Sequence, residues 1–156
     1  MSAGATAAAR LPGALPALEW VTDETRLLRL SQDFSWFSPV LKRQLEGKRA
    51  DVAVKPKTED EIKAVVDACA RERVPLTVRG AATGNYGQIV PLHGGLLLDM
   101  SAFNAFGWAR GGVGRAQAGI RPAQGSSWPL QIGVLHGRSM GASLHGMGPR
   151  VQAGAL

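Results

Sequence analysis

The sequence has 156 residues, of which 45% are apolar and 19% charged, and its net charge is +6. This length supports one domain with a hydrophobic core and excludes two of ordinary size, and the apolar fraction excludes disorder throughout. The single cysteine, Cys69, excludes an internal disulfide framework and a multi-cysteine metal site, and it favours a reducing, cytoplasmic compartment.

Charge is unevenly distributed along the sequence. All 12 acidic residues lie at or before Asp99. The later part contributes only arginines, which are spread out and form no cluster with aromatic residues: Arg110, Arg115, Arg121, Arg138 and Arg150. Because nucleic-acid-binding surfaces gather such residues, we expect no nucleic-acid partner. No apolar run reaches the roughly 18 residues that a membrane-spanning helix needs, so we also expect no membrane span.

The first 49 residues divide into two segments of different composition. Residues 1–18 are rich in Ala, Gly and Pro and resemble no signal peptide, so we expect a flexible leader. Residues 19–49 mix apolar and charged positions with Pro and Gly residues that punctuate helices, which predicts a helical segment. Its aromatic patch is predicted to pack in the core: Phe34, Trp36 and Phe37.

Two short helices are expected in this helical segment. Apolar residues lie between charged ones over 20–33, where Asp23 or Thr22 can cap a short amphipathic helix. A second helix is expected from Pro39 to Leu45, because Pro is favoured in the first turn and a glycine follows shortly after the last.

The next segment has the pattern of a strand, a helix and a second strand. Asp51 to Val54 is a short apolar strand that Pro56 ends, and Leu76 to Val78 is another. Between them, Thr58 and Glu61 have the spacing of a capping box. The helix that follows carries apolar residues with helical spacing: Ile62, Val65, Val66 and Cys69. A crossover of this length predicts that the two strands are parallel.

The pattern weakens toward the end of the sequence. Residues 79–95 are rich in turn-forming residues, and a third apolar strand is expected at 96–99. A fourth candidate strand covers 115–120. Residues 122–156 show no periodicity and no capping signals, so no regular structure is predicted for this atypical tail. A shifted reading frame of GC-rich DNA accounts for its composition, and truncation or divergence does so equally well.

The stretch 79–88 carries the clearest chemical signal. It follows a buried parallel strand, where open α/β sheets bind ligands. Small residues at 80, 81, 82 and 84 leave backbone amides uncovered, and Thr83 and Asn85 add side-chain hydrogen bonds. Gly84 and Gly87 permit a positive φ. These are the properties of a diphosphate-binding loop, although an ordinary surface turn has the same composition. The GxxxxGK[ST] and GxGxxG phosphate motifs are absent.

The order of these pieces resembles the first half of the FAD-binding domain, of the PCMH type, found in the vanillyl-alcohol oxidase and p-cresol methylhydroxylase flavoprotein family. That family includes FAD-linked oxidases such as glycolate oxidase and D-lactate dehydrogenase. The matching pieces are Val52 to Pro56, Thr58 to Arg71, Leu76 to Val78, Arg79 to Thr83, Gly87-Gln88, Gly94-Gly95, Leu96 to Ser101, Phe103-Asn104 and Ala118-Gly119-Ile120. The resemblance implies an incomplete α+β fold, namely the first α/β subdomain of that domain, over residues 50–121.

The resemblance also implies a cofactor and its site. The loop of the family wraps the FAD diphosphate through backbone amides, and the proline lies near the adenine. Carried over residue by residue, the cofactor-binding positions are Pro56, Arg79, Gly80, Ala81, Ala82, Thr83, Gly84, Asn85, Gly87 and Gln88. Some members attach FAD covalently through a histidine in this loop. No histidine lies between 79 and 88, so FAD is expected to bind non-covalently.

The implied function is that of the FAD-binding portion of a flavin-dependent oxidoreductase that acts on hydroxy acids or alcohols. No catalytic residue is identified, because His136 and His145 lie in the atypical tail without a carboxylate partner. Cys69 is predicted to be a packing residue. The portion is therefore expected to be inactive alone. Two alternatives remain, a non-catalytic nucleotide-binding remnant and a nucleotide-sugar reductase of the same fold.

Overall fold

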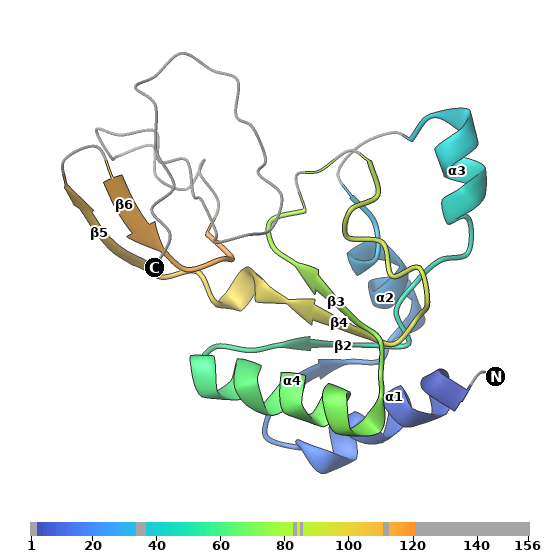
Figure 1. Ribbon diagram of the computed structural model, residues 1–156, viewed down its shortest axis with the longest axis horizontal. Coiled ribbons are helices and arrows are strands. Elements are labelled where there is room, and N and C mark those ends of the chain that lie inside the picture. The colour runs from blue at the N-terminus through green and yellow to red at the C-terminus, as the bar shows by residue number, and fades with distance from the viewer. Residues whose placement is uncertain (1–2, 34–36, 83, 85, 111–112, 121–156) are drawn as a thin grey trace.

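The computed structural model describes residues 3–33, 37–82, 84, 86–110 and 113–120. The elements in chain order are α1 (Ala3–Ala14), β1 (Glu19–Val21), α2 (Glu24–Leu30), α3 (Pro39–Leu45), β2 (Val52–Lys55), α4 (Glu59–Glu72), β3 (Leu76–Arg79), β4 (Leu96–Asp99), the short 3-10 helix η1 (Met100–Ala102), β5 (Phe106–Arg110) and β6 (Val113–Ala116) (Figure 1).

A four-stranded sheet in the order β1-β2-β4-β3 is the centre of the fold. Strands β2 and β3 both pair in parallel with β4, which lies between them, and β1 pairs antiparallel with β2. The predicted parallel arrangement of the two strands around the helix is confirmed, with β4 inserted between them. The carboxyl ends of these three parallel strands consequently share one edge of the sheet.

Both faces of the sheet are covered by helices. Val52, Val54 and Leu98 point to the face that α1 and α4 cover, where they join the larger core cluster. Ala53 and Leu97 point to the opposite face and pack against α2 in a smaller cluster. Figure 1 shows α1 and α4 on one side of the sheet and α2 on the other. Burial on both faces explains why β2 and β4 read as nearly continuous apolar runs.

The predicted capping box of α4 is present. Thr58 Oγ1 accepts a hydrogen bond from Glu61 N (3.2 Å), and Glu61 Oε2 accepts one from Thr58 N (3.3 Å). The apolar stripe differs at one position: Val66 is 40% exposed, and Ala68 is buried beside Val65 and Cys69. The helix is rotated so that these residues face the sheet, which places Val66 at its border.

The flexible leader expected for residues 1–18 is wrong where the structure describes it. Residues 3–14 form α1, whose Ala8 and Leu11 are buried in the larger core cluster. Alanine has the highest helix propensity, and its small side chain lets the helix lie close to α4. Arg10 on α1 also forms an exposed ion pair with Glu72 on α4, with 2.7 Å between Nη2 and Oε2.

The remaining differences concern the ends of elements. The first predicted helix starts later than expected, because Glu19–Val21 pairs with β2 before Asp23 caps α2. The fourth candidate strand covers Val113–Ala116, and its partner is β5 in a separate two-stranded sheet. The predicted helix from Pro39 to Leu45 is confirmed. Of the aromatic patch, Phe34 and Trp36 lie outside the described residues, as does the tail from 122 to 156.

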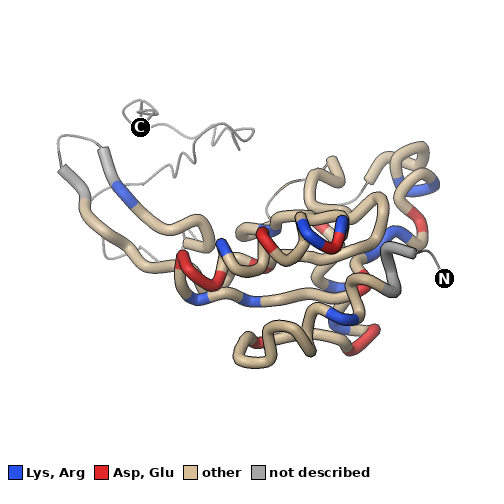
Figure 2. The backbone as a smooth tube through the Cα atoms, turned by 60° about the horizontal axis from the view of Figure 1, so that its bottom comes forward, with Lys and Arg blue, Asp and Glu red and all other residues tan. Residues whose placement is uncertain are grey.

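Acidic and basic residues are interspersed over the part of the chain that the structure describes (Figure 2). Two examples are the pairs that Glu19 forms with Lys55 (3.9 Å) and Lys57 (3.8 Å). No described helix has the length and apolar character that crossing a bilayer would require.

Candidate functional site: the loop after β3

The loop that was predicted to bind a diphosphate begins at the shared edge of the parallel strands. Pro56 follows β2, Gly80 follows β3 and Met100 follows β4. Open α/β sheets bind ligands outside this edge. Pro56 is fully buried, so its side chain belongs to the wall of the edge rather than to its surface. Figure 1 shows the segment between β3 and β4 leaving the edge and running toward α2 and α3.

A buried ion pair fixes the start of the loop. Arg79 Nη1 lies 3.5 Å from Asp99 Oδ1, and the two side chains are 13% and 1% exposed. Asp99 Oδ1 also accepts a hydrogen bond from Ser101 N (3.1 Å). Arg79 Nε is buried and has no partner among the described residues. Arg79 therefore joins the ends of β3 and β4 inside the protein, where the carboxylate of Asp99 balances its charge.

The backbone of residues 118–119 packs behind the start of the loop. A Cβ atom on Gly80 would lie 3.3 Å from the carbonyl oxygen of Ala118. Gly119 N donates to Phe103 O (2.8 Å), and a Cβ atom there would overlap the carbonyl oxygen of Met100. The structure thus brings two distant pieces of the family resemblance, 79–83 and 118–120, to the same place.

The middle of the loop has backbone donors without a partner among the described residues. The amides of Ala81, Ala82 and Gly84 donate to no described residue. Ala82 is buried and has a positive φ of 55°. A non-glycine residue in this conformation carries about 1–2 kcal/mol of strain. Two predicted site residues, Thr83 and Asn85, lie outside the described residues.

Gly84 lacks space for a side chain. A Cβ atom there would lie 2.5 Å from Gln88 Oε1 and 3.3 Å from Asp33 Oδ2. A larger residue would therefore push against the end of the loop. Small residues at 81, 82 and 84 keep the backbone bare, as an approaching phosphate requires.

The end of the loop is held by side chains. Asp33 Oδ2 accepts hydrogen bonds from Gly87 N (2.8 Å) and Gln88 N (3.1 Å), and Gln88 Oε1 accepts one from Tyr86 N (3.1 Å). The positive φ expected for Gly87 is confirmed at 78°. A Cβ atom on Gly87 would lie 2.5 Å from Leu45 Cδ1. The two amides predicted to continue the cofactor contact thus have a carboxylate partner within the chain.

Sequence reasoning missed Asp33 and Leu45. Both belong to the helical segment 19–49, which was treated as separate from the site. Asp33 follows α2 without any motif, and it meets the loop across 54 sequence positions. No local signal marks such a long-range contact.

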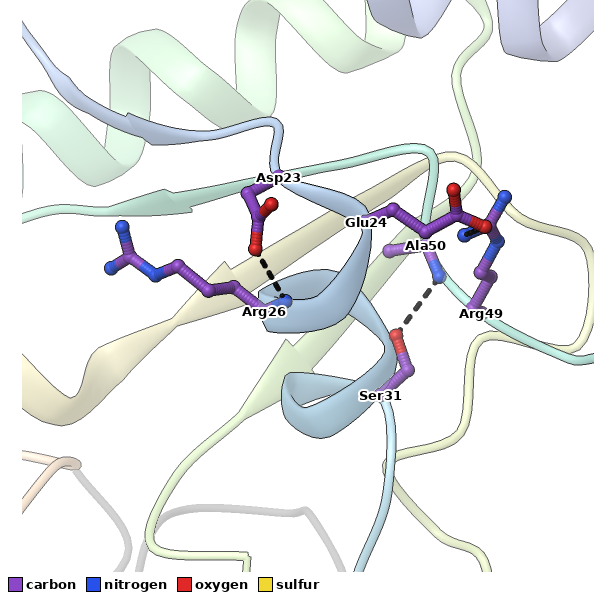
Figure 3. Close-up of polar contacts among 6 residues, drawn as sticks. All are labelled: Asp23, Glu24, Arg26, Ser31, Arg49 and Ala50. Carbon is purple, nitrogen blue, oxygen red and sulfur yellow. Dashed lines mark hydrogen bonds and ion pairs between the residues drawn. The ribbon is translucent and has the colours of Figure 1, made fainter.

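The helical segment is itself tied to the sheet. Asp23 Oδ1 accepts a hydrogen bond from Arg26 N (2.9 Å) and caps α2. At the other end of α2, the fully buried Ser31 accepts one from Ala50 N (3.0 Å), just before β2 (Figure 3). Arg49 pairs with Glu24 (2.6 Å) on the surface beside these contacts. Asp33 is therefore two residues from a buried anchor.

Comparisons with known proteins show the family of this chain. Residues 50–128, about half of the chain, match the family model of the FAD-binding domain. Over 52 residues the chain is 42% identical to the glycolate oxidase subunit GlcD of Escherichia coli strain K12, a match that covers 33% of this chain and 10% of that protein. The chain therefore spans about a tenth of the curated relative it matches.

Two solved structures share the fold. Alkyldihydroxyacetonephosphate synthase is 18% identical with a TM-score of 0.61, and the match covers 77% of this chain and 24% of that one. A structure of p-cresol methylhydroxylase with substrate bound is 16% identical with a TM-score of 0.62, and the match covers 79% of this chain and 24% of that one. The chain belongs to the family of FAD-binding domains of the PCMH type, of which it holds the first α/β part.

Proposed function

We propose that this chain is the FAD-binding portion of a flavin-dependent oxidoreductase, and that the loop after β3 holds the FAD diphosphate. The observation that carries the proposal is the set of amides at Ala81, Ala82 and Gly84. They lie on a loop of small residues beside the carboxyl ends of parallel strands and donate to no described residue. Such amides bind a phosphate without a cationic side chain. The bound flavin would supply the redox chemistry.

The supporting residues have different tasks in this proposal. Gly80 to Gly84 provide donors and keep the backbone accessible. Arg79 fixes the start of the loop through its buried ion pair with Asp99. Pro56 forms part of the buried wall of the edge. Because no histidine lies between 79 and 88, the proposed attachment in this loop is non-covalent.

We further propose that the substrate of the complete enzyme is a small hydroxy acid or alcohol. The support is the 42% identity to a glycolate oxidase subunit over 52 residues. The described residues include no paired general acid and base at the loop, so we expect FAD binding by this chain without turnover. The single cysteine supports a cytoplasmic location.

Reconstitution with FAD tests the proposal. The purified chain is mixed with FAD and desalted, the flavin absorbance of the protein fraction is recorded, and the affinity is measured by quenching of flavin fluorescence. We expect retained FAD and no oxidation of glycolate or D-lactate. A chain that binds no added FAD would contradict the proposal.

A glycine pair adds a test of the site. Gly84→Val is expected to weaken FAD binding at least tenfold, or about 1.4 kcal/mol, because the side chain would enter the space shared with Gln88 and Asp33. Gly13→Val is the matched control, since a Cβ atom on Gly13 meets nothing within 4 Å. Equal affinities of the two variants would refute the assignment of the loop.

A further inference from the structure

The carboxylate of Asp33 is bound by backbone amides at the end of the loop, the kind of donor that also binds phosphate oxygens. One oxygen, Oδ2, accepts hydrogen bonds from the consecutive amides of Gly87 and Gln88 at 2.8 and 3.1 Å. The other, Oδ1, is buried without a partner among the described residues. A carboxylate and a phosphate compete for the same kind of donor, so these two amides cannot serve both at once.

We propose that Asp33 is a positioning residue for the cofactor loop. It holds the amides of Gly87 and Gln88 as part of the structure, and the diphosphate is bound instead by the amides of Ala81, Ala82 and Gly84. This inference rests on the proposed function. It changes the expected role of Gly87 and Gln88 from cofactor donors to the fixed end of the loop.

Three features around Asp33 support its assignment as a positioning residue. Ser31, two residues earlier, is fully buried and accepts a hydrogen bond from Ala50 N (3.0 Å), which ties this segment to the start of β2 (Figure 3). Leu45 of α3 lies against Gly87 on the same stretch of the loop. Gly84 lies so near that a Cβ atom there would be 3.3 Å from Asp33 Oδ2. Withdrawal of the carboxylate would leave the Gly87 and Gln88 amides without their acceptor and disturb this packing.

The charge of Asp33 also supports a positioning role. A carboxylate next to a diphosphate repels it, so the charge by itself disfavours FAD. The gain must come from the geometry that the carboxylate imposes on the loop. A side chain with the same acceptor oxygen and no charge should therefore keep or improve FAD binding, whereas a side chain without an acceptor should weaken it.

Two substitutions separate geometry from charge. Asp33→Asn keeps an oxygen that can accept from both amides, and its NH2 group replaces the oxygen that has no partner. We expect its dissociation constant for FAD to equal that of the wild type or to be lower. Asp33→Ala removes the acceptor, and we expect the dissociation constant to rise at least tenfold. Asp23→Ala is the matched control, because Asp23 accepts from a backbone amide (2.9 Å) in the cap of α2, away from the loop. It should lower the denaturation midpoint and leave FAD binding unchanged.

Amide hydrogen exchange, resolved by residue, supplies a readout that does not depend on affinity. In the wild-type chain, added FAD should slow exchange at Ala81, Ala82 and Gly84 and leave Gly87 and Gln88 as protected as before. In Asp33→Ala, Gly87 and Gln88 should exchange faster even without FAD. Slower exchange at Gly87 and Gln88 on addition of FAD would mean that the diphosphate displaces Asp33, which overturns the inference.

The affinities distinguish the remaining outcomes. If Asp33→Ala binds FAD more tightly than the wild type, Asp33 competes with the cofactor and the inference fails. If Asp33→Ala binds FAD equally well while its stability falls, Asp33 is structural only and the inference also fails. If the wild-type chain binds no FAD, the proposed function itself fails. The affinity of the wild-type chain alone shows this, so the two failures are distinguishable.

Discussion

The two ends of the loop after β3 are held in opposite ways. At its start, Arg79 and Gly80 continue a strand of the sheet, and a buried ion pair with Asp99 fixes them from below. At its end, the amides of Gly87 and Gln88 are held by a side chain from 54 and 55 positions earlier in the chain. At the start of the loop, the ion pair leaves the amides of Ala81, Ala82 and Gly84 without an acceptor among the described residues. At the end of the loop, the carboxylate of Asp33 takes up the two amides that it holds. The start of the loop is therefore suited to bind an anion, and the end is suited to hold the loop in place.

The largest expected effect concerns the start of the loop. Arg79→Met leaves the carboxylate of Asp99, which is 1% exposed, without its ion-pair partner. Removing one partner of a buried pair costs several kcal/mol, and we expect the free energy of unfolding in urea to fall by about 3 kcal/mol. Arg10→Met is the control, because its ion pair with Glu72 is exposed and should contribute less than about 1 kcal/mol. Equal losses in the two variants would show that the Arg79 pair does not fix the start.

The next largest effect concerns the hydrogen bond of Ser31 with Ala50 N, which anchors the segment that carries Asp33. Ser31→Ala removes the acceptor of the buried Ala50 amide and should cost about 2 kcal/mol of unfolding free energy. Because Asp33 lies two residues away, Gly87 and Gln88 should also exchange faster in this variant. Ser38→Ala is the control: Ser38 caps the neighbouring α3 by accepting from Leu41 N (3.2 Å) and forms no hydrogen bond with a described residue of the loop. Unchanged amide exchange at Gly87 and Gln88 in Ser31→Ala would show that the Ser31–Ala50 hydrogen bond does not hold the end of the loop.

A smaller effect concerns the contact between α3 and the loop. Gly87→Ala places a Cβ atom against Leu45 Cδ1 and forces a non-glycine residue to a φ of 78°. We expect a loss of about 1–2 kcal/mol, most of it from the backbone conformation. In combination with Leu45→Ala, the steric part should disappear, and a double-mutant cycle measured by urea unfolding gives its size. Strict additivity would mean that α3 does not constrain the end of the loop.

The smallest expected effect concerns Cys69, a buried residue of α4 in the larger core cluster. Burial raises the pKa of the Cys69 thiol above its ordinary value. The folded state therefore favours the protonated thiol, and this contribution to stability is present at neutral pH and lost as pH rises through the pKa of the folded thiol. Between pH 7 and alkaline pH, the free energy of unfolding should fall slightly more for the wild type than for Cys69→Ala. The opposite order would contradict the assigned burial.

The same thiol reports how often the core opens. A thiol reagent should modify the buried Cys69 faster in each variant according to its loss of unfolding free energy, most in Arg79→Met and less in Ser31→Ala and Gly87→Ala. Equal rates of modification in Arg79→Met and the wild type would mean that the Arg79 pair does not stabilise the core.

The sequence by itself determined the elements whose causes are local. The capping box of Thr58 and Glu61 involves residues three positions apart, the Pro39 helix depends on its own first turn, and the apolar runs of β2 and β4 follow from burial on both faces. The order of these pieces also indicated the family. Only the tertiary structure decided that the Ala-rich start forms a helix on α4, that Val66 lies at the border of the core, and that Ala82 has a positive φ. It also decided that Asp33 meets Gly87. Each of these depends on which distant surface a segment packs against, and that is fixed only when the sheet, the helices and the loop come together.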